Sequence, residues 1–155
     1  MSKQRQKLPK QFRLQVKTKL EALTEVLAWF EQISKPFLED KCVWQCQLAI
    51  AEGFSNAVRY AHQGLPETTP INLEINLFSD FLEIKIWDSG KPFDLKAKLQ
   101  SILNDKDNDP LEREGNRGLY FMDQLTDELQ YIRMSNKRNC LLMRKYINGN
   151  QEIDE

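Results

Sequence analysis

The feature that most constrains the fold is a pair of alternating apolar segments, residues 71–77 and 82–86, separated by a short polar turn at Ser79-Asp80. The apolar positions of the two segments are Ile71, Leu73, Ile75, Leu77, Leu82, Ile84 and Ile86. Alternation with a period of two places these side chains on one face of each strand. The pattern therefore predicts a β-hairpin with one buried face.

The remaining periodic segments predict further strands and amphipathic helices around this hairpin. In chain order we expect a strand at 12–16, helices at 20–35 and 38–63, the hairpin strands at 71–77 and 82–88, a helix at about 117–128, and strands at 130–134 and 140–147. Short turns between consecutive strands favour antiparallel pairing. The predicted fold class is therefore α+β, a two-layer α/β sandwich with a mixed, mostly antiparallel sheet and helices on one face.

One domain is expected over residues 11–147, between a flexible basic tail at 1–10 and a flexible acidic tail at 148–155. Residues 91–117 lack clean periodicity, apart from a short helical pattern at 94–103. An irregular segment of this length inside a compact domain is usually a functional lid or a disordered region.

Charge and composition exclude several classes of function. The 155 residues contain 22 Lys+Arg and 23 Asp+Glu, and this balance disfavours direct binding to nucleic acid. No apolar run approaches the roughly 20 residues of a membrane span, and no signal peptide is expected, so we predict a cytoplasmic protein. Three Cys and one His form no disulfide or zinc pattern.

The second predicted helix carries one polar stripe. At the spacing of an α-helix, Glu52, Asn56, Arg59 and Gln63 fall within about 40° of one line. Taken alone, the stripe is typical of a solvent-facing helix surface. A carboxylate one turn from a carboxamide also suits phosphoryl chemistry, since Asn56 offers an oxygen to Mg²⁺ and Glu52 can accept a proton.

Two further motifs follow this stripe along the chain. Asp88 ends the second hairpin strand on its apolar face and is followed by Gly90, which permits close approach of the backbone. Residues 115–119, Gly-Asn-Arg-Gly-Leu, lead into a helix, and the free N–H groups of a helix start suit phosphate. Alone, the first motif is more typical of an ordinary strand-end turn, and the second of a plain helix start.

Together and in this order, the three motifs resemble those of the Bergerat (GHKL) ATP-binding fold. Glu-x-x-x-Asn at 52–56, Asp-x-Gly-x-Pro-Phe-Asp at 88–94 and Asn-Arg-Gly-Leu at 116–119, with Asp127-Glu128 beyond, are similar to the anti-sigma-factor serine/threonine kinases. The resemblance covers roughly residues 10–147. Two positions depart from the family pattern: Asn116 stands where a glycine is common, and Tyr60 where a histidine is common.

The resemblance implies a role for each motif residue. Glu52 would be the catalytic base toward a protein serine, Asn56 would bind Mg²⁺, and Asp88 would accept a hydrogen bond from the adenine amino group, with Gly90 leaving room for the base. The other residues that the resemblance places at the nucleotide are Arg59, Phe93, Gly115, Arg117, Gly118 and Leu119, with residues 91–117 as the ATP lid. A direct catalytic role for His62 is not expected.

The resemblance also implies the biological setting. It predicts an anti-sigma factor that uses ATP and Mg²⁺ to phosphorylate a STAS-like antagonist protein in a partner-switching system, as a homodimer that also holds a sigma factor. The alternative is a regulatory module that binds ATP without catalysis. A histidine-kinase catalytic domain is disfavoured, because His62 is the only histidine.

Overall fold

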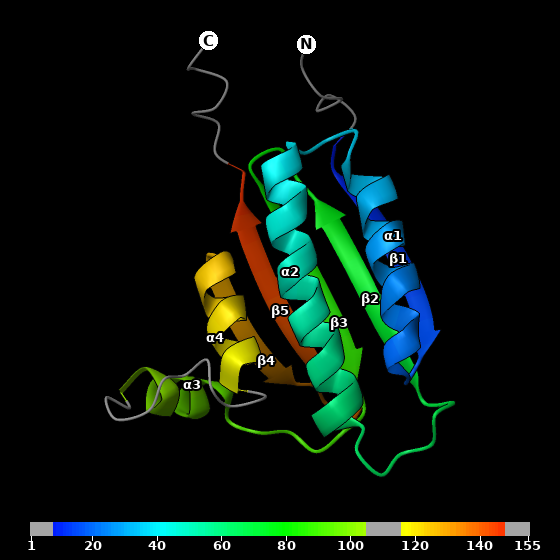
Figure 1. Ribbon diagram of the computed structural model, residues 1–155, viewed down its shortest axis with the longest axis vertical. Coiled ribbons are helices and arrows are strands. Elements are labelled where there is room, and N and C mark those ends of the chain that lie inside the picture. Colours follow the sequence, from blue (N-terminus) through cyan, green and yellow to red (C-terminus); the bar gives the residue numbers. More distant parts are fainter. Residues whose placement is uncertain (1–7, 105–115, 148–155) are drawn as a thin grey trace.

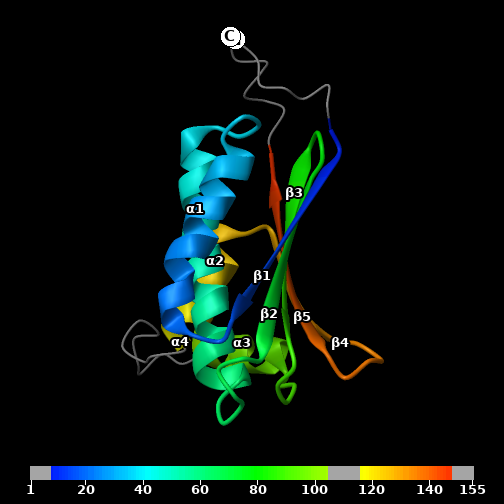
Figure 2. The same cartoon turned by 90° about the vertical axis from the view of Figure 1, so that its right-hand side faces the viewer.

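A computed structural model describes residues 8–104 and 116–147 of the chain. Within these ranges the protein is a five-stranded sheet with helices on one face (Figure 1), and the edge-on view in Figure 2 separates the two layers. The predicted two-layer α+β architecture is confirmed. The predictions for residues 1–7, 148–155 and the middle of the lid, 105–115, lie outside the described residues.

Each predicted strand and helix has a counterpart in the structure. The strands are β1 (Lys10–Lys17), β2 (Pro70–Leu77), β3 (Phe81–Asp88), β4 (Glu128–Arg133) and β5 (Asn139–Tyr146). The helices are α1 (Leu23–Ser34), α2 (Asp40–Asn56), α3 (Leu95–Asn104) and α4 (Asn116–Leu125), with a 3-10 turn η2 (Leu20–Ala22) and a π-helical turn η3 (Ala57–Ala61).

The last helix ends three residues earlier than its predicted end at 128, because the backbone joins the sheet first. The Thr126 hydroxyl donates to the Met122 carbonyl and caps the helix at a distance of 2.6 Å. The Asp127 N–H then donates to the carbonyl of Arg144, 2.8 Å away on β5. β4 therefore begins at Glu128.

The sheet has the strand order β1-β2-β3-β5-β4. Every pairing among the described strands is antiparallel, a simpler sheet than the mixed, mostly antiparallel one that we expected. Asp88 at the end of β3 pairs with Asn139 at the start of β5. This register brings the β4–β5 hairpin beside the turn that follows β3.

The core lies between the sheet and the helical layer. The apolar side chains of the central hairpin, such as Ile75 and Ile84, are fully buried beneath Ile50 and Phe54 of α2. Burying each such side chain contributes about 1.5–3 kcal/mol to the transfer part of the folding free energy. The alternation in 71–77 and 82–86 thus marks the inner face of the sheet, as predicted.

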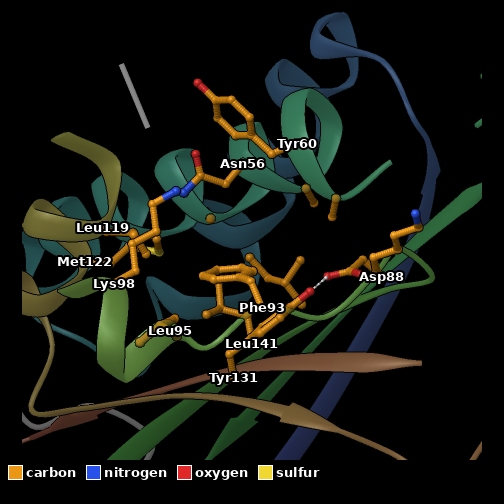
Figure 3. A pocket seen from close by; sticks show the side chains of 15 residues that line it. Asn56, Tyr60, Asp88, Phe93, Leu95, Lys98, Leu119, Met122, Tyr131 and Leu141 are labelled. Carbon is orange, nitrogen blue, oxygen red and sulfur yellow. Dashed lines mark hydrogen bonds between the residues drawn. The ribbon is translucent and has the colours of Figure 1, made fainter. Parts of the chain in front are cut away.

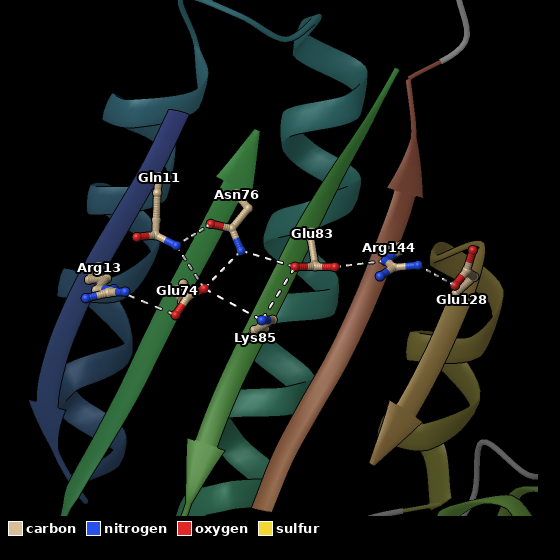
Figure 4. Close-up of polar contacts among 8 residues, drawn as sticks. All are labelled: Gln11, Arg13, Glu74, Asn76, Glu83, Lys85, Glu128 and Arg144. Carbon is tan, nitrogen blue, oxygen red and sulfur yellow. Dashed lines mark hydrogen bonds and ion pairs between the residues drawn. The ribbon is translucent and has the colours of Figure 1, made fainter. Parts of the chain in front are cut away.

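The opposite face of the sheet carries a balanced network of charges and amides (Figure 4). Glu83 accepts hydrogen bonds from Asn76, at 3.1 Å, and from Arg144, at 2.9 Å. Arg144 also pairs with Glu128, while Glu74 pairs with Lys85. The network satisfies the buried polar groups of an otherwise uncovered face, so that this face remains compatible with water.

The three cysteines are free thiols, as the sequence analysis expected. Cys46 and Cys140 are buried, and burial raises the pKa of the Cys140 thiol to about 11. Both residues therefore act as small apolar side chains. Among the helices of residues 8–104 and 116–147, none combines the length and apolarity needed to cross a bilayer.

Candidate functional site

A cavity of about 290 Å³ opens between α2, the end of β3, α3 and α4 (Figure 3). Its apolar lining includes Ile86, Leu95, Leu119, Met122 and Leu141. Its polar lining consists of Asn56, Tyr60, Asp88, Lys91, Lys98 and Tyr131. An apolar cavity with a few convergent polar groups is the usual form of a small-molecule site.

Asp88 lies at one end of this cavity and is almost fully buried, with 4% of its surface exposed. Its Oδ1 accepts hydrogen bonds from the Gly90 N–H, at 2.9 Å, and from Asn139 Nδ2, at 2.8 Å. Its Oδ2 accepts one from the Tyr131 hydroxyl, at 2.9 Å. These donors replace the water that a buried carboxylate loses, so Asp88 is held in one orientation.

A second layer of contacts fixes the turn after Asp88. The side-chain amide of Asn139, which is fully buried, also donates to the Gly90 carbonyl at 2.9 Å. Arg133 Nη1 donates to the same carbonyl, at 3.2 Å, and to Asn139 Oδ1, at 3.3 Å. The start of β5 and the end of β4 therefore position the turn that carries Asp88.

Gly90 is required here by a contact with the backbone. A Cβ atom at this position would lie 1.9 Å from the carbonyl oxygen of Ala61, the last residue of η3. We expected Gly90 to leave room for a ligand, whereas the free space beside its Cα is filled by this carbonyl. Any side chain at residue 90 would push the turn and η3 apart.

Glu52 and Asn56 meet the start of α4. A Cβ at Gly118 would lie 3.0 Å from Glu52 Oε1 and 3.3 Å from Asn56 Nδ2, so a side chain at residue 118 would require these two side chains to shift by a few tenths of an ångström. Asn56 lines the cavity, whereas Glu52 lies one helical turn earlier and is not among the lining residues. The carboxylate of Glu52 also lies beside the first turn of α4, the positive end of the helix dipole.

The predicted polar stripe is interrupted directly after Asn56, where η3 replaces α-helix. The His62 N–H donates to the Ala57 carbonyl five residues earlier, at 2.9 Å, and this bond widens the turn. The widening rotates the following side chains relative to a regular helix. Tyr60, four residues after Asn56, lines the cavity, whereas Arg59, which we predicted as a ligand, is exposed and lies outside the lining.

The cavity mouth is formed by an aromatic pair and a lysine. Phe93, a predicted ligand residue, packs against Tyr131 with 4.7 Å between the ring centroids and the rings tilted by 33°. Lys98 lies on α3, and its ammonium group is 5.9 Å from the centroid of the Phe93 ring. Lys91 and Lys98 supply positive charge that was not predicted, because Lys91 is an unspecified position of the 88–94 motif and Lys98 lies on a short helical pattern with no motif of its own.

Gly115 and Arg117 were also predicted to contact the phosphates. Gly115 lies outside the described residues, and Arg117 belongs to the first turn of α4 but its side chain is not described. Gly118 and Leu119 are both buried, and Leu119 lines the cavity. The structure therefore brings together Asn56, Asp88, Phe93 and Leu119, with Glu52 and Gly118 adjoining Asn56.

His62 is a buried structural residue, with 2% of its surface exposed. The Ser89 N–H donates to His62 Nε2 at 2.8 Å, so this nitrogen is unprotonated. The proton of the neutral ring is therefore on Nδ1, which donates to the Thr18 hydroxyl at 2.8 Å. Thr18 in turn donates to the Thr69 carbonyl at 2.6 Å. This chain of bonds connects the turn after Asp88 to the end of β1.

His62 predicts a specific pH dependence of stability. Burial lowers its pKa below the ordinary value of about 6.5, an effect partly offset by the charge of Asp88. A histidine whose folded-state pKa is depressed stabilises the fold above the unfolded-state pKa, and that contribution is lost as the pH falls below about 6.5. We expect urea midpoints to fall between pH 7.5 and pH 5.5 in wild type, and to fall less in His62→Gln, which keeps an acceptor for Ser89. An equal fall in both proteins would contradict this role.

The fold and the cavity together define a two-layer α+β domain with a small-molecule site. Residues 16–145 match the family described as Histidine kinase-like ATPase domain, and the chain belongs to this family. Membership implies that the protein uses a nucleotide.

Individual relatives are named serine-protein kinase RsbW. The protein of Staphylococcus epidermidis is 34% identical over 107 residues, which are 68% of this chain and 66% of that protein. The protein of Bacillus subtilis strain 168 is 30% identical over 106 residues, 66% of this chain and 64% of the relative. The chain thus spans slightly less than two thirds of the length of these relatives. The resemblance drawn from the motifs is confirmed.

A solved structure shares the fold. The crystal structure of the SiaB-SiaC complex from Pseudomonas aeruginosa contains a chain that superposes with a TM-score of 0.59 and 12% identity, covering 88% of this chain and 89% of that one. At this identity the likeness concerns the fold alone.

Proposed function

We propose that the protein is an anti-sigma factor with ATP-dependent protein serine kinase activity, which phosphorylates an antagonist protein in a partner-switching system. The observation that carries the proposal is the meeting of Glu52, Asn56 and Gly118 beside a cavity that ends at Asp88. The similarity to relatives named serine-protein kinase supports the same reading.

The proposed nucleotide position follows from the polar groups of the cavity. Asp88 would accept a hydrogen bond from the adenine amino group, with Phe93 and Leu119 against the base. The phosphates would lie toward the start of α4, where the free N–H groups of a helix start suit phosphate and Lys98 would add positive charge. Gly115, Arg117 and Arg59 remain predicted contacts to the phosphates or the lid.

Asn56 fits a magnesium ion carried by the nucleotide. Mg²⁺ commonly takes only one or two ligands from the protein and the rest from phosphates and water. Among the described residues there is no cluster of three or more His, Cys, Asp or Glu that could hold a metal by itself. The side-chain oxygen of Asn56 at the cavity is a suitable single ligand, and a bound Mg²⁺ would neutralise phosphate charge.

Glu52 is the proposed general base. Its carboxylate would take the proton of the substrate serine as the serine oxygen bonds to the γ-phosphorus and the bond to ADP breaks. The cavity residues and the helix start would hold the reacting groups in line, which supplies most of the catalysis in phosphoryl transfer.

A second candidate is a regulatory module that binds ATP without turnover. It is favoured by one observation, that Glu52 adjoins the cavity but does not line it.

In the proposed function a sigma factor and a STAS-like antagonist are the partners, and the protein is a homodimer in the cytoplasm. The binding module would share these partners without modifying them.

The test is a pull-down with the full chain from its native cell, followed by calorimetry with Mg-ATP and a transfer assay with radiolabelled ATP on the bound proteins. We expect micromolar or tighter binding and label on a serine of a small partner. Binding without label on any partner would favour the binding module. Absence of Mg-ATP binding would exclude both functions.

A further inference from the structure

The carboxylate of Asp88 has one unused acceptor position. An ionised carboxylate offers about four lone-pair sites on its two oxygens. Oδ1 accepts from Gly90 and Asn139, whereas Oδ2 accepts from Tyr131 alone among the described residues. A ligand that donates to Asp88 will therefore do so at Oδ2, directly beside the Tyr131 hydroxyl.

Tyr131 is held so that its hydroxyl faces this position. The residue lies on β4 and lines the cavity, and its ring packs against Phe93 (Figure 3). The Tyr131 hydroxyl oxygen and Asp88 Oδ2 are 2.9 Å apart. The two atoms are therefore near enough for one planar ligand to contact both of them with neighbouring polar atoms of one edge. The cavity therefore presents an acceptor and a hydroxyl donor side by side.

From this pair we infer that Tyr131 is a base-specificity residue, which donates a hydrogen bond to the adenine ring nitrogen next to the amino-bearing carbon while Asp88 accepts from the amino group. The inference rests on the proposed function in one respect, that the ligand is ATP. When the base binds, the Tyr131 hydroxyl turns from Asp88 to the ring nitrogen. An amino hydrogen takes the vacated place on Oδ2, so no polar group loses a partner.

Asp88 and Tyr131 together would discriminate adenine from guanine by the order of hydrogen-bond donors and acceptors on the base. Adenine presents a donor followed by an acceptor along this edge, matching Asp88 followed by Tyr131. Guanine presents a carbonyl oxygen and a ring N–H, which would place an acceptor against the carboxylate. Burial, and next the charge of Asp88, raise the pKa of Tyr131, so the hydroxyl remains a donor throughout the neutral range.

The experiment compares ATP with 1-deaza-ATP, in which carbon replaces the ring nitrogen, by calorimetry with the full chain and Mg²⁺. For wild type we expect 1-deaza-ATP to bind about tenfold more weakly than ATP, the effect of one lost hydrogen bond with a buried partner. For Tyr131→Phe, which keeps the ring against Phe93, we expect the two nucleotides to bind equally and the preference for ATP over GTP to fall. Tyr146→Phe removes a hydroxyl that contacts Glu128 at the far end of the hairpin, and should keep the wild-type ratios.

The outcomes separate this inference from the proposed function. If wild type binds ATP and 1-deaza-ATP equally, or if Tyr131→Phe weakens both without changing their ratio, Tyr131 does not read the ring nitrogen and the inference is overturned while ATP binding stands. If wild type binds neither nucleotide, the proposed function fails and the inference fails with it. The wild-type comparison needs no substitution, so equal binding of the two nucleotides would overturn the inference even where Tyr131→Phe folds poorly.

Discussion

Replacing Glu52 by glutamine is expected to lower phosphoryl transfer to the partner serine by about 10²–10⁴-fold, the usual contribution of general base catalysis. Glutamine has nearly the same shape, so the contact of residue 52 with Gly118 is preserved, but its amide cannot accept the serine proton. Because Glu52 does not line the cavity, the affinity for Mg-ATP should change by less than about threefold. Transfer of radiolabel and calorimetry on the same preparation measure the two quantities.

The matched control is Glu25→Gln, an exposed acid of α1 whose substitution should leave both quantities unchanged. Wild-type rates of transfer in Glu52→Gln would show that another group accepts the proton. Loss of ATP binding in the variant would show that Glu52 acts on the nucleotide rather than on the serine.

Replacing Asp88 by asparagine is expected to weaken Mg-ATP binding by more than tenfold. The remaining acceptor on Oδ2 becomes an amide N–H₂ or is turned away from the base, so the adenine amino group loses its partner. The hydrogen bonds from Gly90, Asn139 and Tyr131 also lose a charged acceptor, and each such bond contributes about 1.5–3 kcal/mol. Calorimetry measures the first effect and thermal unfolding the second.

Asp80→Asn is the control for this change, since it alters an exposed acid at the β2–β3 turn. Wild-type affinity of Asp88→Asn for Mg-ATP would show that the adenine base does not bind at this end of the cavity. A variant that binds weakly but melts at the wild-type temperature would assign the loss to the ligand contact alone.

The fold was accessible from the sequence because its strongest signals are local. Alternation in β2 and β3 and the three-to-four spacing in α1 each follow from which face of one element is buried. The strand order was not accessible in this way. The pairing of β3 with β5 depends on contacts between residues 51 to 65 positions apart, and no periodicity encodes them.

The candidate site, like the fold, was predictable from the sequence only in part. Asp88, Asn56 and Glu52 belong to motifs that are continuous in sequence, and the structure brings them to one cavity and its edge. Tyr131 and Asn139 were not predicted, because nothing near them in the sequence marks them as polar partners of Asp88. Only the register of β5 against β3 places Asn139 opposite this residue.

The π-turn was the other feature that the sequence did not predict. Residues 57–61, Ala-Val-Arg-Tyr-Ala, contain neither glycine nor proline, so they favour continuation of a regular helix. The wider turn is favoured by contacts beyond the helix, where Ala61 packs against Gly90 and His62 bonds to Ser89. The predicted stripe was centred on Glu52 and Asn56 and so included Arg59, whereas the face that lines the cavity runs through Gly53, Asn56 and Tyr60.

A π-turn is equivalent to an α-helix that has absorbed one inserted residue, and η3 thereby sets the phase between α2 and the turn after β3. Deleting a single residue from 57–61 would therefore restore a regular helix and leave His62 close to its present phase. A further inserted residue would instead rotate His62 by about 100° and take its ring away from Ser89. The segment between Asn56 and His62 should consequently tolerate the loss of one residue better than the gain of one.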